Sequence, residues 1–211
     1  MKKGIIFDLD GTLWDSSTAV VDSWNEALER YTDVSYRATL DMMKGFMGKT
    51  MDAIAYEFFC DETKEKAREL MQICMDYEND YIEKHGGILF DGLEETLALL
   101  KEQGYFLAIV SNCQKGYIEA FLAYHDLGKY FDDTENFGNT GKDKDYNIRL
   151  VVDRNNLERA VYVGDIMGDY NSTIKAGLPF IHAAYGFGTV PEGTPKINDI
   201  RELQYKIKEV I

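Results

Sequence analysis

The sequence has little cysteine, and neither a long apolar run nor a leader-like start. Its three cysteines, Cys60, Cys74 and Cys113, are too few and too scattered for a disulfide framework or a zinc site. No stretch approaches the roughly 18 consecutive apolar residues of a membrane span. An acid already stands at Asp8, where a signal peptide would need a longer apolar segment. We therefore expect a cytoplasmic protein without a membrane partner.

Basic side chains are also scarce. The 211 residues contain 23 Lys and Arg against 37 Asp and Glu, a formal net charge of −14. This balance argues against a nucleic-acid partner, because phosphate backbones select Lys and Arg patches. A small phosphorylated substrate remains compatible if a metal ion supplies the positive charge. The composition gives no indication of the oligomeric state.

Short apolar runs alternate with helical patterns along most of the chain. Continuous rather than alternating apolar character is typical of strands buried on both faces, as in a parallel sheet. We expect strands over 4–10, 105–110, 160–163 and 180–185, and helices over 93–100, 115–127, 148–152, 169–176 and 200–210. Strands alternating with helices of this length predict an α/β fold, a doubly wound parallel sheet.

The segment 15–87 differs, because it contains no convincing strand and shows three helical faces. The third face comprises Ala67, Leu70, Met71, Cys74, Tyr77 and Tyr81. A block of this length is too long for a loop. We therefore predict an α/β core domain of residues 1–14 and 88–211, into which an α-helical domain of residues 15–87 is inserted.

Acidic and polar side chains fall at the ends of three predicted strands. Asp8 and Asp10 end the first, Ser111-Asn112 ends the second, and Asp165 follows the third, with Asp169 four residues on. The carboxyl ends of parallel strands meet at one edge, where ligands bind. Four carboxylates there would repel one another unless a divalent cation were bound. Oxygen ligands that also leave room for phosphate favour Mg²⁺.

These residue types at this spacing suit phosphoryl transfer. One carboxylate can attack phosphorus and form an aspartyl-phosphate. A second, two residues away, can protonate the leaving oxygen and then activate water. A lysine must balance the charge of the transferring group. Lys142 and Lys144 lie just before a predicted helix, and both remain candidates.

Taken together, the motifs resemble those of the haloacid dehalogenase superfamily of phosphohydrolases. The resemblance rests on D-x-D-G-T-L from Asp8, on Ser111 after a strand, on the lysine, and on G-D-x-x-x-D from Gly164. It spans residues 5 to about 188. The helical insert directly after the first motif resembles the subfamily with a helical cap, the phosphoglycolate phosphatase-like and β-phosphoglucomutase-like group.

The resemblance implies a role for each motif residue. Asp8 would be the nucleophile and Asp10 the general acid and base. Ser111, helped by the amide of Asn112, would bind the phosphoryl group, and Thr12 is a further substrate-binding candidate. The Mg²⁺ ligands would be the Asp8 carboxylate, the Asp10 backbone carbonyl and Asp165, with Asp169 close by.

Two departures from the family pattern bear on these roles. Many capped members have Gly-Lys-Pro at the lysine motif, whereas Asp143 follows Lys142 here. Spacing back from Gly164 favours Lys142, and the position directly before the helix favours Lys144. The dehalogenase branch needs no metal and lacks the second acid of the first motif, so Asp10 and Asp169 argue against dehalogenation.

A second glycine-lysine motif, Gly48-Lys49-Thr50, resembles the end of a phosphate-binding P-loop. Met43 stands where that loop requires glycine, and a helical pattern rather than a strand precedes it. Lys49 could instead contact the substrate's leaving group from the cap, the alternative being a plain loop between helices.

The function expected from these motifs is a Mg²⁺-dependent phosphatase that hydrolyses a small phosphate monoester through an aspartyl-phosphate. The alternatives are a phosphomutase of the β-phosphoglucomutase type and a catalytically idle binding or regulatory protein on the same fold.

Overall fold

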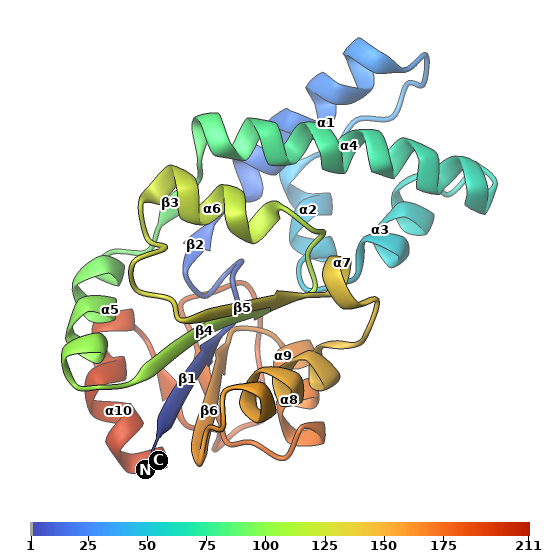
Figure 1. Cartoon of the computed structure of the whole chain (residues 1–211). Coiled ribbons are helices and arrows are strands. Elements are labelled where there is room, and N and C mark those ends of the chain that lie inside the picture. Colours follow the sequence, from blue (N-terminus) through green and yellow to red (C-terminus); the bar gives the residue numbers. More distant parts are fainter. Residues whose placement is uncertain (1) are drawn as a thin grey trace.

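A six-stranded parallel sheet forms the centre of the structure, a computed structural model that describes residues 2–211 (Figure 1). Its strand order is β5-β4-β1-β6-β7-β8, and every neighbouring pair is parallel. The strands are β1 (Lys3–Phe7), β4 (Phe106–Ser111), β5 (Asp133–Asn136), β6 (Arg159–Gly164), β7 (Phe180–Ala183) and β8 (Lys196–Ile197). From β1 the chain proceeds through β4 to the edge strand β5, and it then returns to the other side of β1 to form β6, β7 and β8. The strand order reverses at β1, and ligands are expected outside the carboxyl end of the strand at such a reversal.

Helices cover both faces of this sheet. They are α5 (Leu93–Glu102), α6 (Tyr117–His125), α7 (Phe137–Thr140), α8 (Lys144–Arg154), α9 (Met167–Lys175) and α10 (Leu203–Val210), with a 3-10 turn η1 (Ile200–Glu202). Successive residues of β1 point to opposite faces. Ile5 and Phe7 join a core with Leu97 of α5, whereas Ile6 joins a second core with Ile148 of α8. The predicted doubly wound α/β fold is confirmed.

Four further helices lie across the end of the sheet at which β1 finishes (Figure 1). They are α1 (Ser17–Tyr31), α2 (Leu40–Phe46), α3 (Met51–Phe58) and α4 (Lys64–His85). A short antiparallel pair, β2 (Trp14–Asp15) with β3 (Ile88–Leu89), brackets them where the chain leaves the sheet and where it returns. Among the described residues, no helix is both long and apolar enough to cross a membrane.

The buried face of α4 differs from the expected one in its second half. The predicted face continued through Tyr77 and Tyr81, but both side chains are only half-buried. Glu78 and Ile82 take the buried positions instead. The first four predicted residues, Ala67, Leu70, Met71 and Cys74, are buried as expected. A helical stripe advances by three or four residues per turn, and here a four-residue step from Cys74 places a carboxyl group inside the protein.

Candidate active site

Asp8 stands directly after β1, the strand between β4 and β6 in the sheet. Its backbone N–H donates to the carbonyl of Val163 at 2.8 Å, which continues the β1–β6 pairing to the strand end. The side chain is buried, and one carboxylate oxygen accepts a hydrogen bond from Lys144 Nζ at 2.9 Å. Burial raises the pKa of Asp8 well above its ordinary value, and Asp169 raises it further.

Lys144, rather than Lys142, reaches this carboxylate. Lys144 is the first residue of α8, and its side chain is only 2% exposed. Its Nζ contacts both Asp8 and, at 2.6 Å, Asp169. Burial alone would lower the pKa of Lys144, but the two carboxylates outweigh it and the pKa is raised. Lys142 precedes the helix in an exposed loop, so the structure does not bring it to the site.

Asp165 and Asp169 follow β6 and complete an acidic cluster. Asp169 accepts hydrogen bonds at Oδ2 from the backbone N–H groups of Asp165 (3.1 Å) and Ile166 (3.2 Å). A Cβ at Gly164 would lie 2.7 Å from the Asp169 carboxyl carbon, so this close approach requires glycine. Asp165 Oδ2 accepts from the backbone N–H of Phe187 at 2.7 Å. Phe187 lies between Gly186 and Gly188, in a segment whose glycines predict a loop near the site, but no family motif marks its N–H as a donor.

The cluster has the features of a divalent-cation site. Carboxylate oxygens of Asp8, Asp165 and Asp169 all lie within 4.8 Å of one another, and all three residues are buried. Asp165 Oδ1 is buried without a hydrogen-bond partner. Burial, together with Asp169, raises the pKa of Asp165 to about 7. A buried oxygen without a partner in a set of hard oxygen donors fits Mg²⁺, which binds through few carboxylates and retains waters.

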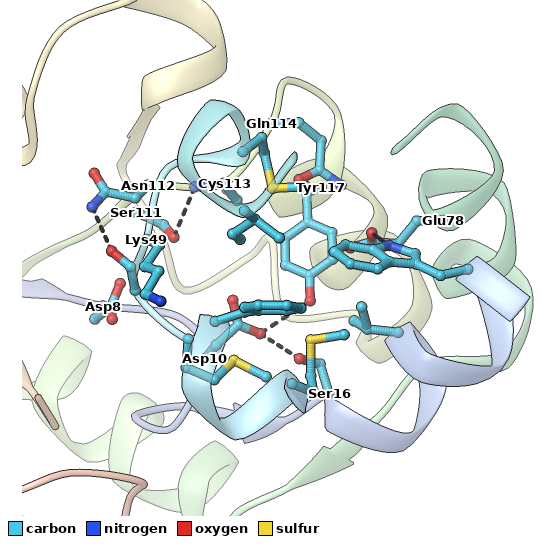
Figure 2. Close-up of a pocket in the computed structure, with 18 residues that line it drawn as sticks. Asp8, Asp10, Ser16, Lys49, Glu78, Ser111, Asn112, Cys113, Gln114 and Tyr117 are labelled. Atoms are coloured by element: carbon cyan, nitrogen blue, oxygen red, sulfur yellow. Dashed lines mark hydrogen bonds between the residues drawn. The ribbon is translucent and has the colours of Figure 1, made fainter. Parts of the chain in front are cut away.

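Asp10 is not one of the three clustered carboxylates. Its side chain lies between two hydroxyl groups (Figure 2). Its Oδ1 accepts from Ser16 Oγ at 2.5 Å and from Tyr117 Oη at 3.0 Å. Burial raises the pKa of Asp10, although these hydrogen bonds counteract part of the effect. Sequence reasoning missed Ser16 and Tyr117. Ser16 directly precedes α1 and was a recognisable helix-start residue, whereas Tyr117 comes from α6 and carries no local signal.

The other candidate residues differ in whether they line the cavity that contains Asp8 and Asp10. Ser111 ends β4 and lines the same cavity as Asp8 and Asp10. Asn112 also lines it, and its side-chain amide donates to the carbonyl of Gly48 at 2.8 Å. Thr12 is fully buried, with a hydroxyl that has no hydrogen-bond partner. Thr12 is not one of the described residues that line this cavity.

Lys49 lies in the loop between α2 and α3 and lines the cavity as well. Its Nζ pairs with Glu57 at 2.5 Å, at the protein surface. The preceding Gly48 has φ +76°, and a Cβ there would lie 2.0 Å from Ile166 Cδ1. This loop therefore packs directly against the segment that carries Asp165, and Asn112 holds its backbone.

Comparison with known proteins identifies the family. The sequence profile of the haloacid dehalogenase-like hydrolases matches residues 5–183. The chain belongs to this family. It is 27% identical to pyrophosphatase PpaX of Bacillus velezensis, over 82% of this chain and 79% of that protein. It is also 27% identical to phosphoglycolate phosphatase of Salmonella typhimurium, over 88% of this chain and 82% of the relative.

Solved structures agree with this assignment. A predicted phosphatase from Clostridium acetobutylicum superposes with a TM-score of 0.78 at 26% identity, covering 99% of both chains. CbbY from Rhodobacter sphaeroides, determined in complex with phosphate, shares the fold with a TM-score of 0.81 at 20% identity, over 96% of each chain. The resemblance inferred from the four haloacid dehalogenase motifs is confirmed, and with it the expectation of a hydrolase.

Proposed function

We propose that this haloacid dehalogenase-type enzyme is a Mg²⁺-dependent phosphatase that hydrolyses a small phosphate monoester through an aspartyl-phosphate. The supporting observation is the placement of Asp8. It is buried at the end of β1, paired with Lys144, and grouped with Asp165 and Asp169. A carboxylate so placed has a cation beside it and metal-binding oxygens around it. Attack on an anionic phosphoryl group requires such positive charge, because two anions must approach each other.

In this proposal, each step uses residues whose positions are described above. Asp8 attacks phosphorus, and the bond from phosphorus to the ester oxygen breaks. Asp10 donates its proton to that leaving oxygen, and its buried position, which raises its pKa, favours the protonated form at the outset. Water then attacks the phosphorus of the aspartyl-phosphate, Asp10 takes a proton from that water, and inorganic phosphate leaves with Asp8 restored.

Charge balance comes from three groups in this scheme. The carboxylates of Asp8, Asp165 and Asp169, with the backbone carbonyl of Asp10, would hold Mg²⁺, which supplies positive charge to the phosphate oxygens. Lys144 fixes the orientation of Asp8 and neutralises part of the transferring charge. Ser111 and the backbone N–H of Asn112 would bind the phosphoryl oxygens. The Asn112 side chain already donates a hydrogen bond to the carbonyl of Gly48, so its backbone N–H is the available donor.

We further propose that residues 15–87 act as a cap domain over a core of residues 1–14 and 88–211. The β2–β3 pair stands at both crossings between the two parts, which is where a hinge would be placed. The contact of Gly48 with Asn112 and Ile166 is that of a closed cap. Closure of this kind excludes bulk water during the first chemical step.

The substitution Asp8→Asn tests the nucleophile. It preserves the shape of the side chain but removes its nucleophilic charge, so hydrolysis of p-nitrophenyl phosphate in Mg²⁺ should fall by about 10³-fold or more. Asp22→Asn, at an exposed position of α1, is the matched control and should retain full activity. Chelation of Mg²⁺ by EDTA should abolish turnover by the unmodified enzyme. Undiminished phosphate release from Asp8→Asn would refute the assignment.

A further inference from the structure

We infer that the cavity between the catalytic edge of the sheet and helices α1 to α4 is a leaving-group site for a small, partly apolar alcohol that donates a hydrogen bond to Glu78, and that it rejects leaving groups carrying a negative charge. This inference rests on the proposed phosphatase function and names its substrate class. Neither Glu78 nor the helices around it belong to the four motifs that identify the family.

The cavity connects the reacting carboxylates with the interior of the helical segment (Figure 2). Asp8, Asp10 and Ser111 line one end, and Glu78 lies at the other, beyond the ring of Tyr117. The walls between them are mainly apolar and come from Val20, Trp24, Met43, Phe46, Met51 and Ile54. A phosphate held at Asp8 would therefore direct its ester group along an apolar channel toward a carboxyl group.

The free volume of this cavity sets the size of the leaving group. It measures about 60 Å³, whereas a single water needs about 10–15 Å³. Space of this kind holds only about four to six water-sized groups, so the leaving group is restricted to a short chain with one polar terminus. A nucleoside or a disaccharide is too large for the closed arrangement.

Packing does not require a carboxyl group at Glu78. It occupies a position on the buried face of α4 where its helical neighbours are Cys74 and Ile82. The side chain is 3% exposed, the Trp24 indole N–H donates to its Oε2, and the Gln114 side chain is a second hydrogen-bond partner. Among the described residues, no cation forms an ion pair with it. Burial raises the pKa of Glu78 to about 8. A buried acid without a cationic partner is costly, and a hydrogen-bond donor from a ligand would offset part of that cost.

The cavity offers an anionic leaving group no free positive charge. Glu78 contributes a carboxyl group whose raised pKa favours its neutral form, so an anion is disfavoured by the lack of a cation rather than by repulsion from Glu78. Lys49 is the one cationic side chain among the described lining residues, and it is already paired with Glu57. A second phosphate or a carboxylate bound here would lose its hydration, and it would find no unpaired cation in the cavity. The cavity therefore differs chemically from one built for pyrophosphate or phosphoglycolate, the compounds that appear in the names of two relatives.

Four esters of matched length test this selectivity. They are propyl phosphate, 3-hydroxypropyl phosphate, 3-aminopropyl phosphate and 2-carboxyethyl phosphate, each assayed for phosphate release in Mg²⁺. The hydroxyl ester should give the highest kcat/KM. Propyl phosphate should be lower by about tenfold, because Glu78 then loses its donor, and carboxyethyl phosphate lower by about 100-fold. A higher kcat/KM for the amino ester than for the hydroxyl ester would overturn the assignment of an alcohol.

Two substitutions assign the effect to Glu78. Glu78→Leu should reduce the preference for the hydroxyl ester over propyl phosphate to less than about twofold. Glu78→Gln, whose amide oxygen still accepts a hydrogen bond, should retain the preference for the hydroxyl ester. The control is Glu83→Gln, an exposed acid on the same helix, which should leave all ratios unchanged. Because each ratio is measured within one variant, a partial loss of folded protein cancels.

The outcomes separate the two proposals. If the enzyme hydrolyses p-nitrophenyl phosphate but cleaves carboxyethyl phosphate as well as the hydroxyl ester, the inference is wrong and the phosphatase function stands. An unchanged hydroxyl-to-propyl ratio in Glu78→Leu also overturns the inference alone. If the unmodified enzyme releases phosphate from none of these esters, the proposed function fails, and the inference fails with it.

Discussion

Replacement of Lys144 by Met tests the electrostatic design of the site. The Lys144 ammonium lies 2.9 Å from Asp8 and 2.6 Å from Asp169, and all three side chains are at most 5% exposed. Methionine retains most of the packing volume but removes the charge. Lys142→Met, two residues earlier in an exposed loop, is the matched control, and the pair of variants decides between the two lysines that the motif spacing left open.

The size of the effect follows from the two contacts. At an effective dielectric constant of 20, each attracts by about 6 kcal/mol before desolvation of the ammonium and the carboxylates is subtracted. Breaking a buried ion pair from one side typically costs about 3–5 kcal/mol. Protonation of Asp8, whose pKa is already raised, would limit the loss. We therefore expect Lys144→Met to lower the free energy of unfolding by about 3 kcal/mol at pH 7.5, and Lys142→Met by less than about 0.5 kcal/mol.

Urea unfolding in EDTA, followed by circular dichroism, measures this difference. Addition of Mg²⁺ should stabilise Lys144→Met more than the unmodified protein, because the cation enters a cluster that has lost its positive charge. Phosphatase activity should be lost in Lys144→Met and retained in Lys142→Met. Equal unfolding free energies for the two variants would refute the reasoning, as would loss of activity in Lys142→Met alone.

Three further perturbations have defined expectations. Burial raises the pKa of Glu78 from 4.5 to about 8. The unfolded chain therefore loses this proton at a lower pH than the folded protein does. As the pH rises from 4.5 to 8, the free energy of unfolding decreases. Relative to the unmodified protein, Glu78→Gln should gain up to roughly 4 kcal/mol in urea unfolding between pH 4.5 and pH 8.5. Tyr117→Phe removes the 3.0 Å donor to Asp10 but keeps the ring, so steady-state assays should show kcat lowered by about 3- to 10-fold with KM nearly unchanged. Gly11→Ala places a Cβ 2.2 Å from Asp165 Oδ2 at φ +79°, so the melting temperature and the affinity for Mg²⁺, measured by calorimetry, should both fall.

The sheet could be predicted where its strands are fully buried. β1, β4, β6 and β7 lie within or next to apolar runs that the sequence displays plainly. β5 was missed because its residues, Asp133–Asn136, are polar. It forms one edge of the sheet, where one side of the strand lacks a partner. Asp133 and Thr134 are half-buried there, and the buried Glu135 pairs with Arg154. β8 forms the other edge, and two residues are too few to produce a pattern.

The candidate site was predictable in its motifs but not in its supporting contacts. Strand ends place Asp8 and Asp165 together, because parallel strands finish at a common edge, and Asp169 follows in the first turn of α9. The choice of Lys144 depends on where α8 begins, a boundary that sequence patterns locate only to within a few residues. Tyr117 reaches Asp10 across 107 positions of the chain, and no local pattern reports such a contact. Glu78 could have been found as the acid on an otherwise apolar helical face.

The central position of β1 also has a consequence for the order of folding. β1 pairs with β4 at Gly4 and Phe106, and with β6 at Lys3 and Arg159, so Asp8 meets its partners only after two segments more than 100 residues distant have returned. Helices α1 to α4 can form from contacts within one short stretch of chain, and such local contacts generally form faster than parallel pairing. During refolding, helical signal should therefore recover before the first turnover is detected, and enzyme activity should report completion of the sheet.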